Sequence, residues 1–436
     1  MNTLYPPISS AVEIANYFSS LIRNEDMQPG DSLPSVRQLA GDLGINPNTV
    51  ASAYAKLRDA GLITTGGRRG SRVAERQTTF DIGSGAIDGL FDLSQGNMDP
   101  DLIPSLSLLS GFKNKNMSGY DININSPELL NTASDWFLEQ KIPELEIGVF
   151  SGALDAMERA LRARTLPGDR VWVEDPCWPP LLKLLNYLHL KAVPLSMDSE
   201  GCTLPANDGK VCSAVILTPR AQNPTGISLT PARASEWTGF FKDHPDCLLI
   251  IDDFWGPLTD KSFSIIENPQ AQLYILSLSK FLGPDLRISI VNGSSQMVAE
   301  MQRQQLIGPR WVSHILQDAA ASLWKIAVTK NLLNIATESY QLRRKQLLNA
   351  LPLEITSDLL LGDGIHLWIP VLSETAVVQH MAAKGWAIQE GSPFRLNSPS
   401  AVRISLGNVK ENTINQLASD LIESLKKSEA GERRIN

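Results

Sequence analysis

The sequence has few cysteines and histidines and no long hydrophobic run. Its 436 residues include four cysteines and five histidines, all scattered, with no CxxC pair. This spacing argues against a zinc site and a disulfide framework, and we predict no metal site. The apolar run Leu248–Ile251 stops at Asp252 and Asp253, well short of the ~20 residues that cross a membrane. Because the N-terminus lacks the apolar segment of a secretory signal, we expect a cytoplasmic protein.

The net charge of −8 is unevenly distributed along the chain. Residues 1–76 carry a net charge of +1 and the remainder −9, whereas residues 45–76 alone carry +4. A locally basic stretch before an acidic body indicates that only the N-terminal part meets a polyanion. On charge alone, ordinary solvated surface is the favoured interpretation. The length predicts two or three domains.

The first 75 residues have the pattern of three helices followed by a β-hairpin. Apolar residues recur at helical spacing in three stretches, over residues 12–22, 35–43 and 47–60. Two short β-rich runs, 62–64 and 71–73, flank a basic, glycine-rich tip. Helix, short turn, helix and hairpin are the parts of a winged helix-turn-helix, so we predict a DNA-binding domain over residues 1–75.

Polar and basic side chains lie on the outer faces of the second and third predicted helices and on the hairpin. A narrow polar helix face fits the major groove, and a basic tip suits phosphate or minor-groove contact. The residues predicted to contact DNA are Ser35, Arg37, Asn48, Thr49, Ser52, Lys56, Arg68, Arg69 and Arg72. The stretch from Pro29 to Ile63 resembles the DNA-binding domain of the GntR family throughout its length, which implies binding of double-stranded operator DNA.

A polar, glycine-rich stretch over residues 76–92 reads as a linker. From residue 93 to residue 436, helical segments alternate with short β-rich runs at 170–173, 192–195, 214–217, 248–251, 274–278 and 288–292. This alternation predicts an α/β domain with a mostly parallel sheet covered on both faces. In such sheets ligands bind beyond the carboxyl ends of the strands, and the informative residues cluster there.

One group of residues suits a phosphorylated aldehyde. Lys280 ends a predicted strand among hydroxyl side chains, as a lysine that forms a Schiff base would. Hydroxyl and guanidinium donors, together with a glycine at a helix N-terminus, suit a phosphate monoester. The residues that supply these donors are Ser277, Ser279, Arg287, Gly152 and Ala153.

A second group suits an aromatic heterocycle. Asp252, at the tip of an apolar strand, can hold a pyridine nitrogen in its protonated form. Asn223 can donate to a ring oxygen, and Trp178 can stack on the ring. Each residue alone also fits a helix cap, a turn, the core or, for Lys280, the surface. Their joint order, each at an element boundary, favours a binding site.

Together these motifs resemble the fold type I pyridoxal 5'-phosphate enzymes, the aspartate aminotransferase superfamily, over residues ~93–430. The resemblance implies a large sheet domain with a small C-terminal α+β part, and pyridoxal 5'-phosphate bound to Lys280. Arg403 matches the arginine that binds a substrate or effector carboxylate. A GntR-type domain fused to such a body is the architecture of the MocR subfamily of bacterial regulators. That resemblance implies a head-to-tail homodimer, in which Tyr120 would reach the partner's phosphate.

The chain departs from the family pattern at three places. Phe254 follows Asp252 and Asp253 where a tyrosine is usual, so a phenol that would contact the ring oxygen is missing. We expect altered acidity of the Schiff base but no loss of cofactor binding. Cys177 and Trp178 stand where a tyrosine is frequent, which preserves stacking. The region around Tyr120 lacks the usual glycine and Leu-Arg pair.

Three functions are compatible with the sequence. The first is a regulator that responds to pyridoxal 5'-phosphate, or to an amino acid or amine that forms an external aldimine at Lys280. The second is an active aminotransferase with an accessory DNA-binding domain, in which Lys280 moves a proton. The third is a body that only dimerises the DNA-binding domains. The intact set of site residues argues against the third. Phe254, and a DNA-binding domain that an aminotransferase does not need, argue against the second. The effector, the operator and the sign of regulation stay open.

Overall fold

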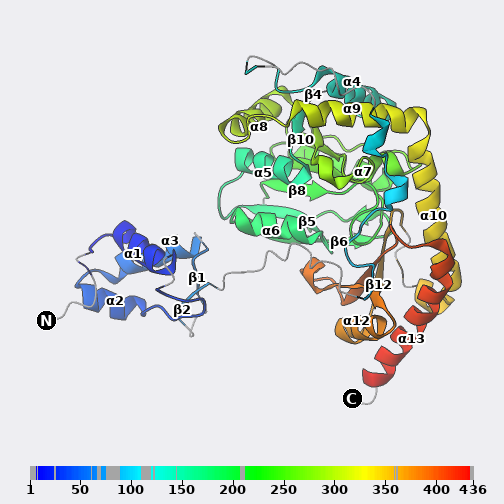
Figure 1. The fold of residues 1–436 in the computed structure, drawn as a ribbon. Helices are drawn as coiled ribbons and strands as arrows, with labels where there is room; N and C mark the ends of the chain where they lie inside the picture. The colour runs from blue at the N-terminus through cyan, green and yellow to red at the C-terminus, as the bar shows by residue number, and fades with distance from the viewer. Residues whose placement is uncertain are drawn as a thin grey trace. The chain divides into compact units, whose positions relative to one another are not determined.

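The chain divides into two compact units, residues 1–84 and 85–436 (Figure 1). The computed structural model describes residues 6, 8–23, 26–59, 61–65, 70–74, 89–109, 119–120, 123–143, 145–206, 212–357, 359 and 362–432.

The first unit is a three-helix domain with a small antiparallel hairpin. Its elements are α1 (Ala11–Arg23), α2 (Val36–Leu43), α3 (Pro47–Asp59), β1 (Ile63–Thr65) and β2 (Ser71–Val73). In the hairpin, Ile63 lies opposite Val73, and Ser32 forms a further bridge to Arg72. All five predicted elements are confirmed, with ends shifted by about one residue. The hairpin tip, residues 66–69, lies outside the described residues.

Local capping explains why the helices of the first unit begin and end where they do. The Ser35 hydroxyl accepts the backbone N–H of Gln38 at 3.2 Å, which caps the N-terminus of α2. Gly44, at φ +67°, ends α2 in the left-handed conformation that glycine adopts most easily. The Tyr54 hydroxyl donates to the Pro34 carbonyl at 2.8 Å, so α3 is fixed to the start of α2. Apolar residues of all three helices and both strands form one core.

An eight-stranded sheet forms the centre of the second unit, in the order β4–β11–β10–β9–β8–β5–β6–β7. The strands are β4 (Glu146–Phe150), β5 (Arg170–Asp175), β6 (Lys191–Asp198), β7 (Gly201–Cys202), β8 (Ala214–Leu217), β9 (Leu248–Asp253), β10 (Gln272–Ser277) and β11 (Ser289–Gly293). Neighbours from β10 to β6 are parallel, whereas β11 is antiparallel to β10 and β4. The predicted mostly parallel sheet is therefore confirmed, and β4 and β7 are strands that the sequence pattern did not predict.

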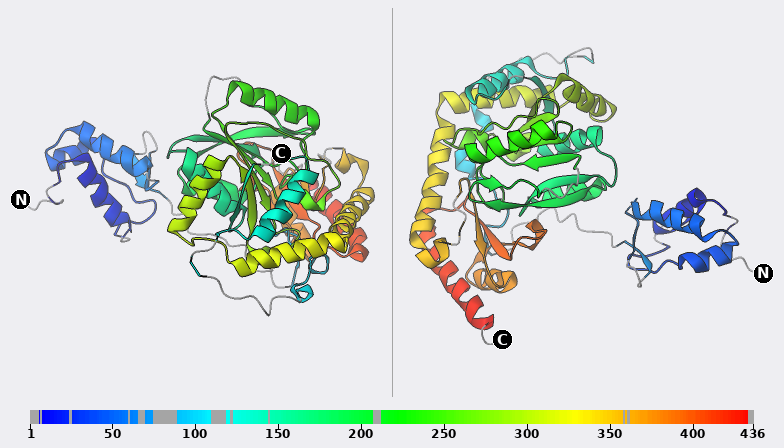
Figure 2. Two further views of the ribbon diagram at one scale, coloured as in Figure 1. Left: turned by 90° about the horizontal axis from the view of Figure 1, so that it is seen from above. Right: turned by 180° about the vertical axis from the view of Figure 1, so that it is seen from behind.

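Helices cover both faces of this sheet (Figure 2). One face packs against α4 (Pro127–Glu139), α7 (Pro231–Asp243), α9 (His314–Thr329) and α10 (Leu332–Ala350). The other packs against α5 (Ala153–Arg164), α6 (Pro179–Tyr187) and α8 (Ser295–Ile307). Within β9, Leu249 and Ile251 belong to the first core, and Leu248 and Ile250 to the second. Burial on both faces is why this strand reads as a continuous apolar run.

The C-terminal part of the second unit has its own antiparallel sheet and core. Its elements are α11 (Leu353–Thr356), β12 (His366–Pro370), α12 (Glu374–Ala383), β13 (Trp386–Ala387), β14 (Gln389–Glu390), β15 (Ala401–Ser405) and α13 (Ile414–Glu432). The described 3-10 helices are η2 (Pro100–Leu102), η3 (Leu106–Leu108), η5 (Gly256–Leu258), η6 (Pro284–Leu286), η7 (Ser392–Phe394) and η8 (Glu411–Thr413). No helix in the described ranges has the length and hydrophobicity to cross a membrane.

The predicted linker, residues 76–92, extends too far at its C-terminal end. Residues 75–88 lie outside the described part of the chain. Phe91 and Asp92 form β3 (Phe91–Asp92), which pairs in parallel with β13 of the second unit. A strand of two residues is too short to show alternation, so the sequence pattern did not reveal it. The second unit therefore begins before residue 93.

Candidate functional site

The structure brings most of the predicted site residues of the second unit to one edge of the large sheet. Parallel strands β4, β5, β8, β9 and β10 all end at this edge, and the antiparallel strand β11 begins there. The residues at these strand ends are Gly152, Ala153, Trp178, Asn223, Asp252, Ser277, Ser279, Lys280 and Arg287. This is the edge at which ligands bind in open α/β sheets.

Gly152 and Arg287 form a close pair at the N-terminus of α5. Gly152 has φ +97°, and a Cβ atom there would lie 3.0 Å from a terminal nitrogen of Arg287. Arg287 itself has φ +50°, at the end of η6. Close by in sequence, the Ser279 N–H donates to the Ser277 hydroxyl at 3.5 Å. A guanidinium group beside free helix N–H groups is an arrangement that binds an anion.

Asp252 is a buried carboxyl group at the end of β9. One of its oxygens, Oδ1, has no hydrogen-bond partner among the described residues. Burial, reinforced by the neighbouring Asp253 and Glu174, raises the pKa of Asp252 to about 8. An unpaired buried oxygen is costly, and its presence points to a partner from outside the chain.

Glu174, on β5, is a second buried carboxyl group that the sequence analysis missed. It accepts the Thr218 N–H at 2.8 Å, and burial raises its pKa to about 7. Its sequence signal is the same as that of Asp252, an acidic residue at the end of an apolar strand.

Lys280 is half-buried just after β10. Its Nζ atom donates a hydrogen bond to the Gly96 carbonyl at 2.9 Å. Burial lowers its pKa to about 8, and the positive charge of Arg403 acts in the same direction. The amine of Lys280 is therefore closer to its neutral, nucleophilic form at pH 7 than that of an ordinary lysine.

Arg403, on β15, reaches this site from the C-terminal part of the unit. Its guanidinium donates to the side-chain oxygen of Asn223 at 3.0 Å and to the Ser94 carbonyl. The guanidinium carbon lies 4.7 Å from the centre of the Phe394 ring. Burial lowers the pKa of Arg403 to about 10, still high enough for a full positive charge at pH 7. The predicted carboxylate-binding residue is thus in contact with one of the predicted ring-binding residues.

His366, on β12, is buried next to Gly96. It was not predicted from the sequence, because β12 was not recognised as a strand. Its Nδ1 atom is 3.0 Å from the Ser405 hydroxyl, and its Nε2 atom has no partner in the described part of the chain. Burial, followed by the charges of Arg403, Lys280 and Arg344, holds the pKa of His366 well below its ordinary value. The imidazole is therefore neutral at pH 7. No cluster of three or more potential metal ligands is found within the described ranges.

Two aromatic residues of the prediction differ in their surroundings. Trp178 precedes α6 as its N-cap residue and is half-buried against the core formed by α5 and α6. Tyr120 is 80% exposed, and its described ring contacts are with Trp311, at 6.1 Å, and with the Arg310 guanidinium, at 5.1 Å. Phe254, which replaces the usual tyrosine, is half-buried with its ring 6.2 Å from that of Trp255.

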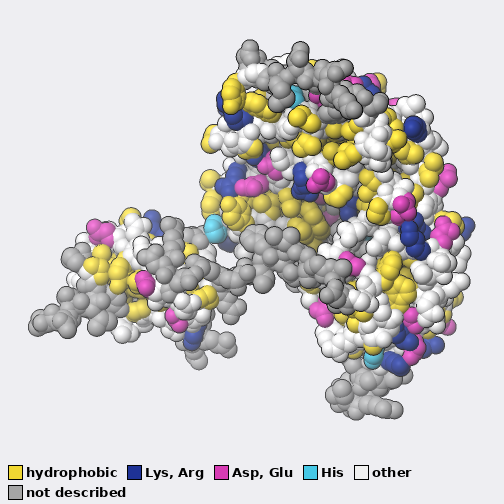
Figure 3. Space-filling model, viewed as in Figure 1, with side chains coloured by type: hydrophobic (Ala, Val, Ile, Leu, Met, Phe, Trp, Pro, Cys, Tyr) yellow, Lys and Arg dark blue, Asp and Glu magenta, His cyan; other side chains and the backbone are white. Residues whose placement is uncertain are grey.

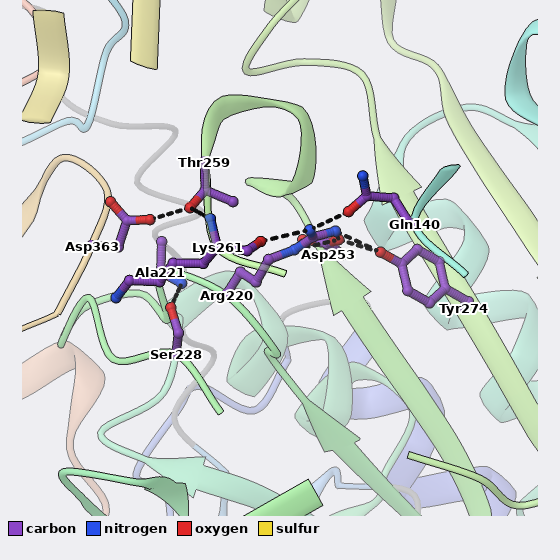
Figure 4. Close-up of polar contacts among 9 residues, drawn as sticks. All are labelled: Gln140, Arg220, Ala221, Ser228, Asp253, Thr259, Lys261, Tyr274 and Asp363. Carbon is purple, nitrogen blue, oxygen red and sulfur yellow. Dashed lines mark hydrogen bonds and ion pairs between the residues drawn. The ribbon is translucent and has the colours of Figure 1, made fainter. Parts of the chain in front are cut away.

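Arg220 and Asp253 are the centre of a buried ionic network (Figure 4). Arg220 forms an ion pair with Asp253 and donates a hydrogen bond to the Gln140 side chain at 2.7 Å. Asp253 also accepts a hydrogen bond from the Tyr274 hydroxyl. These contacts join the loop that carries Asn223 to strands β9 and β10. The sequence analysis missed Arg220, because its partner Asp253 lies 33 residues away.

In the first unit, the predicted DNA-contacting residues fall into three groups. Those exposed on α2 and α3 are Arg37, Asn48, Ser52 and Lys56. Ser35, Thr49 and Arg72 have structural surroundings as well. Ser35 caps α2, Thr49 is half-buried, and Arg72 donates to the Gly30 carbonyl at 2.8 Å. Arg68 and Arg69 lie outside the described residues.

Comparison with known families gives two matches that together cover most of the chain. Residues 11–73 match the bacterial regulatory proteins of the gntR family, and residues 90–421 match the aminotransferase class I and II family. The second family depends on pyridoxal 5'-phosphate.

Relatives of similar length are named as transcriptional regulators. The vitamin B6 salvage pathway transcriptional repressor PtsJ of Salmonella typhimurium is 37% identical over 403 residues, which cover 91% of this chain and 94% of that protein. The HTH-type pyridoxine biosynthesis transcriptional regulator PdxR of Corynebacterium glutamicum is 23% identical, covering 78% of this chain and 76% of that protein.

Solved aminotransferase structures share the fold. The α-aminoadipate aminotransferase LysN of Thermus thermophilus superposes with a TM-score of 0.70 at 17% identity, covering 86% of this chain and 99% of that chain. The kynurenine aminotransferase of Pyrococcus horikoshii gives a TM-score of 0.70 at 19% identity, with 78% and 92% covered. The chain therefore belongs to the aminotransferase class I and II family and, with its gntR-family N-terminal domain, is a transcriptional regulator of the MocR type.

Proposed function

We propose that this regulator senses pyridoxal 5'-phosphate. The second unit would bind the cofactor at Lys280, and occupancy of that site would change how the first unit binds operator DNA. The observation that carries the proposal is the position of Lys280 at the same sheet edge as the Gly152–Arg287 pair and the unpaired buried oxygen of Asp252. The names of PtsJ and PdxR, both tied to vitamin B6, support it.

The residues present fit this cofactor at both of its ends. The Oδ1 atom of Asp252, which has no hydrogen-bond partner among the described residues, would accept a hydrogen bond from the pyridinium nitrogen. The guanidinium group of Arg287 supplies two parallel N–H donors for a phosphate monoester. It lies so close to Gly152 that any side chain there would collide with it. The backbone N–H groups of residues 152 and 153 and the hydroxyls of Ser277 and Ser279 would complete the phosphate site.

When bound, pyridoxal 5'-phosphate supplies an aldehyde that amines attack and a ring that withdraws electrons. Lys280 would provide the attacking amine, for which its lowered pKa suits it. Trp178 would lie against the ring, and Asn223 would donate to the ring oxygen. Arg403 would bind the carboxylate of an amino acid effector.

Regulation rather than turnover is the main role we assign to the second unit. Phe254 removes the phenol that would support catalysis by contacting the ring oxygen. A slow transaminase-type half-reaction is the second candidate, favoured by the lowered pKa of Lys280, which suits an amine that moves protons.

We also propose that the regulator acts as a head-to-tail homodimer. Large apolar side chains are exposed at the end of α8 and the start of α9, among them Ile307, at 89%, and Ile315, at 53%. Figure 3 shows hydrophobic side chains on the surface over α8. The exposed side chains of Tyr120 and Arg310 form a second cluster with the half-buried Trp311. Surfaces of this kind mark protein interfaces, and a second copy is the partner expected for a regulator that reads two DNA half-sites.

One experiment tests the proposal with the full-length protein. Its operator is first obtained by selecting bound sequences from random DNA, and DNA affinity is then measured with and without pyridoxal 5'-phosphate. We expect a cofactor absorbance band that is lost in Lys280→Ala, and a cofactor-dependent change in DNA affinity that the variant lacks. A protein that stays colourless in excess cofactor would refute the proposal.

The double variant Arg37→Ala with Asn48→Ala tests the DNA-binding surface separately. Both side chains are exposed on α2 and α3, so their loss leaves the core of the first unit intact. We expect specific DNA binding to be lost while cofactor absorbance is unchanged. Retention of operator binding would contradict the assignment of these two residues.

A further inference from the structure

Ser94–Asn97, a short segment that we term the strap, is held by two of the basic side chains of the proposed site. The Gly96 carbonyl accepts from Lys280 at 2.9 Å, and the Ser94 carbonyl accepts from Arg403. Two residues of the same segment are therefore bonded to the lysine that would bind the cofactor and to the arginine that would bind a carboxylate.

Cofactor attachment is incompatible with the first of these bonds. The cofactor would supply an aldehyde carbon to which the nitrogen of Lys280 would be joined, and two hydrogens of the neutral amine would leave with the aldehyde oxygen as water. The nitrogen of Lys280 would then keep at most one hydrogen and would no longer be an amine donor to the Gly96 carbonyl. Gly96 therefore loses its donor when the cofactor binds. Similarly, a carboxylate bound to Arg403 would compete with the Ser94 carbonyl for the N–H groups of the guanidinium.

The strap has no room to move further inward. Gly96 has φ +68°, and a Cβ atom there would lie 2.7 Å from Cε1 of His366. The Asn97 carbonyl oxygen occupies the space into which a side chain at Gly407 would point. Any rearrangement of the strap must therefore carry it away from His366 and from the residues that follow β15.

The strap is also the part of the site closest in sequence to the DNA-binding unit. It begins two residues after β3. Two backbone hydrogen bonds of 2.8 Å hold β3 to the C-terminal part: the Phe91 N–H donates to the Gly385 carbonyl, and the Leu93 N–H donates to the Ala387 carbonyl. Residues 74–90 connect β3 to the last strand of the first unit. A change in the strap therefore acts on the segment from which the DNA-binding unit extends.

We propose that the strap is an internal competitor for Lys280 and Arg403, and that its displacement by the cofactor passes the signal to the DNA-binding unit. The inference rests on the proposed function and adds its route of regulation. In the cofactor-free protein the carbonyls of Gly96 and Ser94 hold the strap in place. In the loaded protein the strap is released, which removes a support next to β3, the strand from which the tether to the first unit starts.

Gly96→Ala is the decisive variant, because the added methyl group collides with His366 and expels the strap without a ligand. Gly89→Ala is the matched control, since Gly89 also has positive φ, at +87°, but has open space around it. Allosteric couplings amount to about 5- to 150-fold in affinity, so we expect loading to change the DNA affinity of the wild type and of Gly89→Ala by a factor in this range. Gly96→Ala should bind DNA with the loaded affinity in both states, while still showing the absorbance of bound cofactor.

Hydrogen exchange of the wild-type protein provides a second measurement that needs no variant. A peptide covering residues 93–99 should exchange faster after loading with pyridoxal 5'-phosphate.

Unchanged or slower exchange, or a full wild-type response of a folded Gly96→Ala protein, overturns the role of the strap. If Gly96→Ala fails to fold, the exchange result alone decides. A wild type that binds no cofactor overturns the proposed function and the strap together. A wild type that binds it and changes its DNA affinity without a change in exchange overturns the strap alone.

Discussion

The guanidinium group of Arg403 donates a hydrogen bond to the side-chain oxygen of Asn223, a residue 180 positions earlier in the chain. This bond determines what Asn223 can offer to a ligand. Because its oxygen accepts from Arg403, its NH2 group remains as the donor. Asn223 is thus oriented to donate to a phenolate oxygen, as the proposed cofactor site requires.

Arg287→Ala should weaken the binding of pyridoxal 5'-phosphate by about 10- to 100-fold, because hydrogen bonds to charged groups contribute roughly 1.5–3 kcal/mol. Binding of pyridoxal, which has no phosphate, should change little. Titration of absorbance with each compound measures the two affinities. Arg162→Ala, on the exposed face of α5 and paired with Glu158, is the control and should bind both like the wild type. Equal losses for both compounds would exclude a phosphate role for Arg287.

Asp252→Asn should bind pyridoxal 5'-phosphate more weakly, again by about 10- to 100-fold, since the amide cannot form an ion pair with the ring nitrogen. Glu174→Gln is the informative comparison. Glu174 raises the pKa of Asp252, so removing its charge should preserve or strengthen binding. Spectral titration of both variants measures the effect, and a loss in Glu174→Gln as large as that in Asp252→Asn would contradict the roles given to the two carboxyl groups.

The rate of cofactor attachment should rise with pH and level off above a pH of about 8, the pKa of Lys280. Only the neutral amine attacks the aldehyde, and below this pKa its fraction falls about tenfold for each pH unit. Arg403 contributes to lowering this pKa, so Arg403→Gln should move the midpoint to higher pH. Stopped-flow absorbance from pH 6 to 10 provides the measurement. A wild-type rate that still rises steeply at pH 10 would show an ordinary lysine.

Arg220→Met should strongly destabilise the second unit, by about 3–5 kcal/mol, because it leaves the buried carboxylate of Asp253 unpaired. Urea unfolding followed by tryptophan fluorescence would show a lower midpoint. Arg303→Ala removes an ion pair with Glu300 from the exposed face of α8, and its midpoint should stay at the wild-type value. Equal midpoints for Arg220→Met and the wild type would mean that the network of Figure 4 does not hold the site together.

The sequence predicted the residues whose signal is local. Lys280 and Asp252 each stand at the end of an apolar strand, and in a parallel sheet these ends meet at one edge whatever the details of packing. The helices and hairpin of the first unit were predictable for the same reason, because caps such as Ser35 and Gly44 act within one turn.

The residues that sequence patterns missed depend on contacts between distant positions. Gly96 meets Lys280 across 184 residues, and no feature of the stretch around Gly96 reveals that its carbonyl has this partner. His366 lies on β12, a strand of only five residues, whose alternation is too short to be read with certainty in a sequence.

The pairing of β3 with β13 determines how the second unit can be separated from the first. In the intact chain the rings of Phe91 and Trp386 lie 5.7 Å apart, and Trp386 is buried. A polypeptide truncated at residue 93 would lose this cover, exposing an indole and an unpaired strand edge that invites aggregation. A fragment that starts at Gly89 keeps β3 and is therefore the one to express for crystallisation.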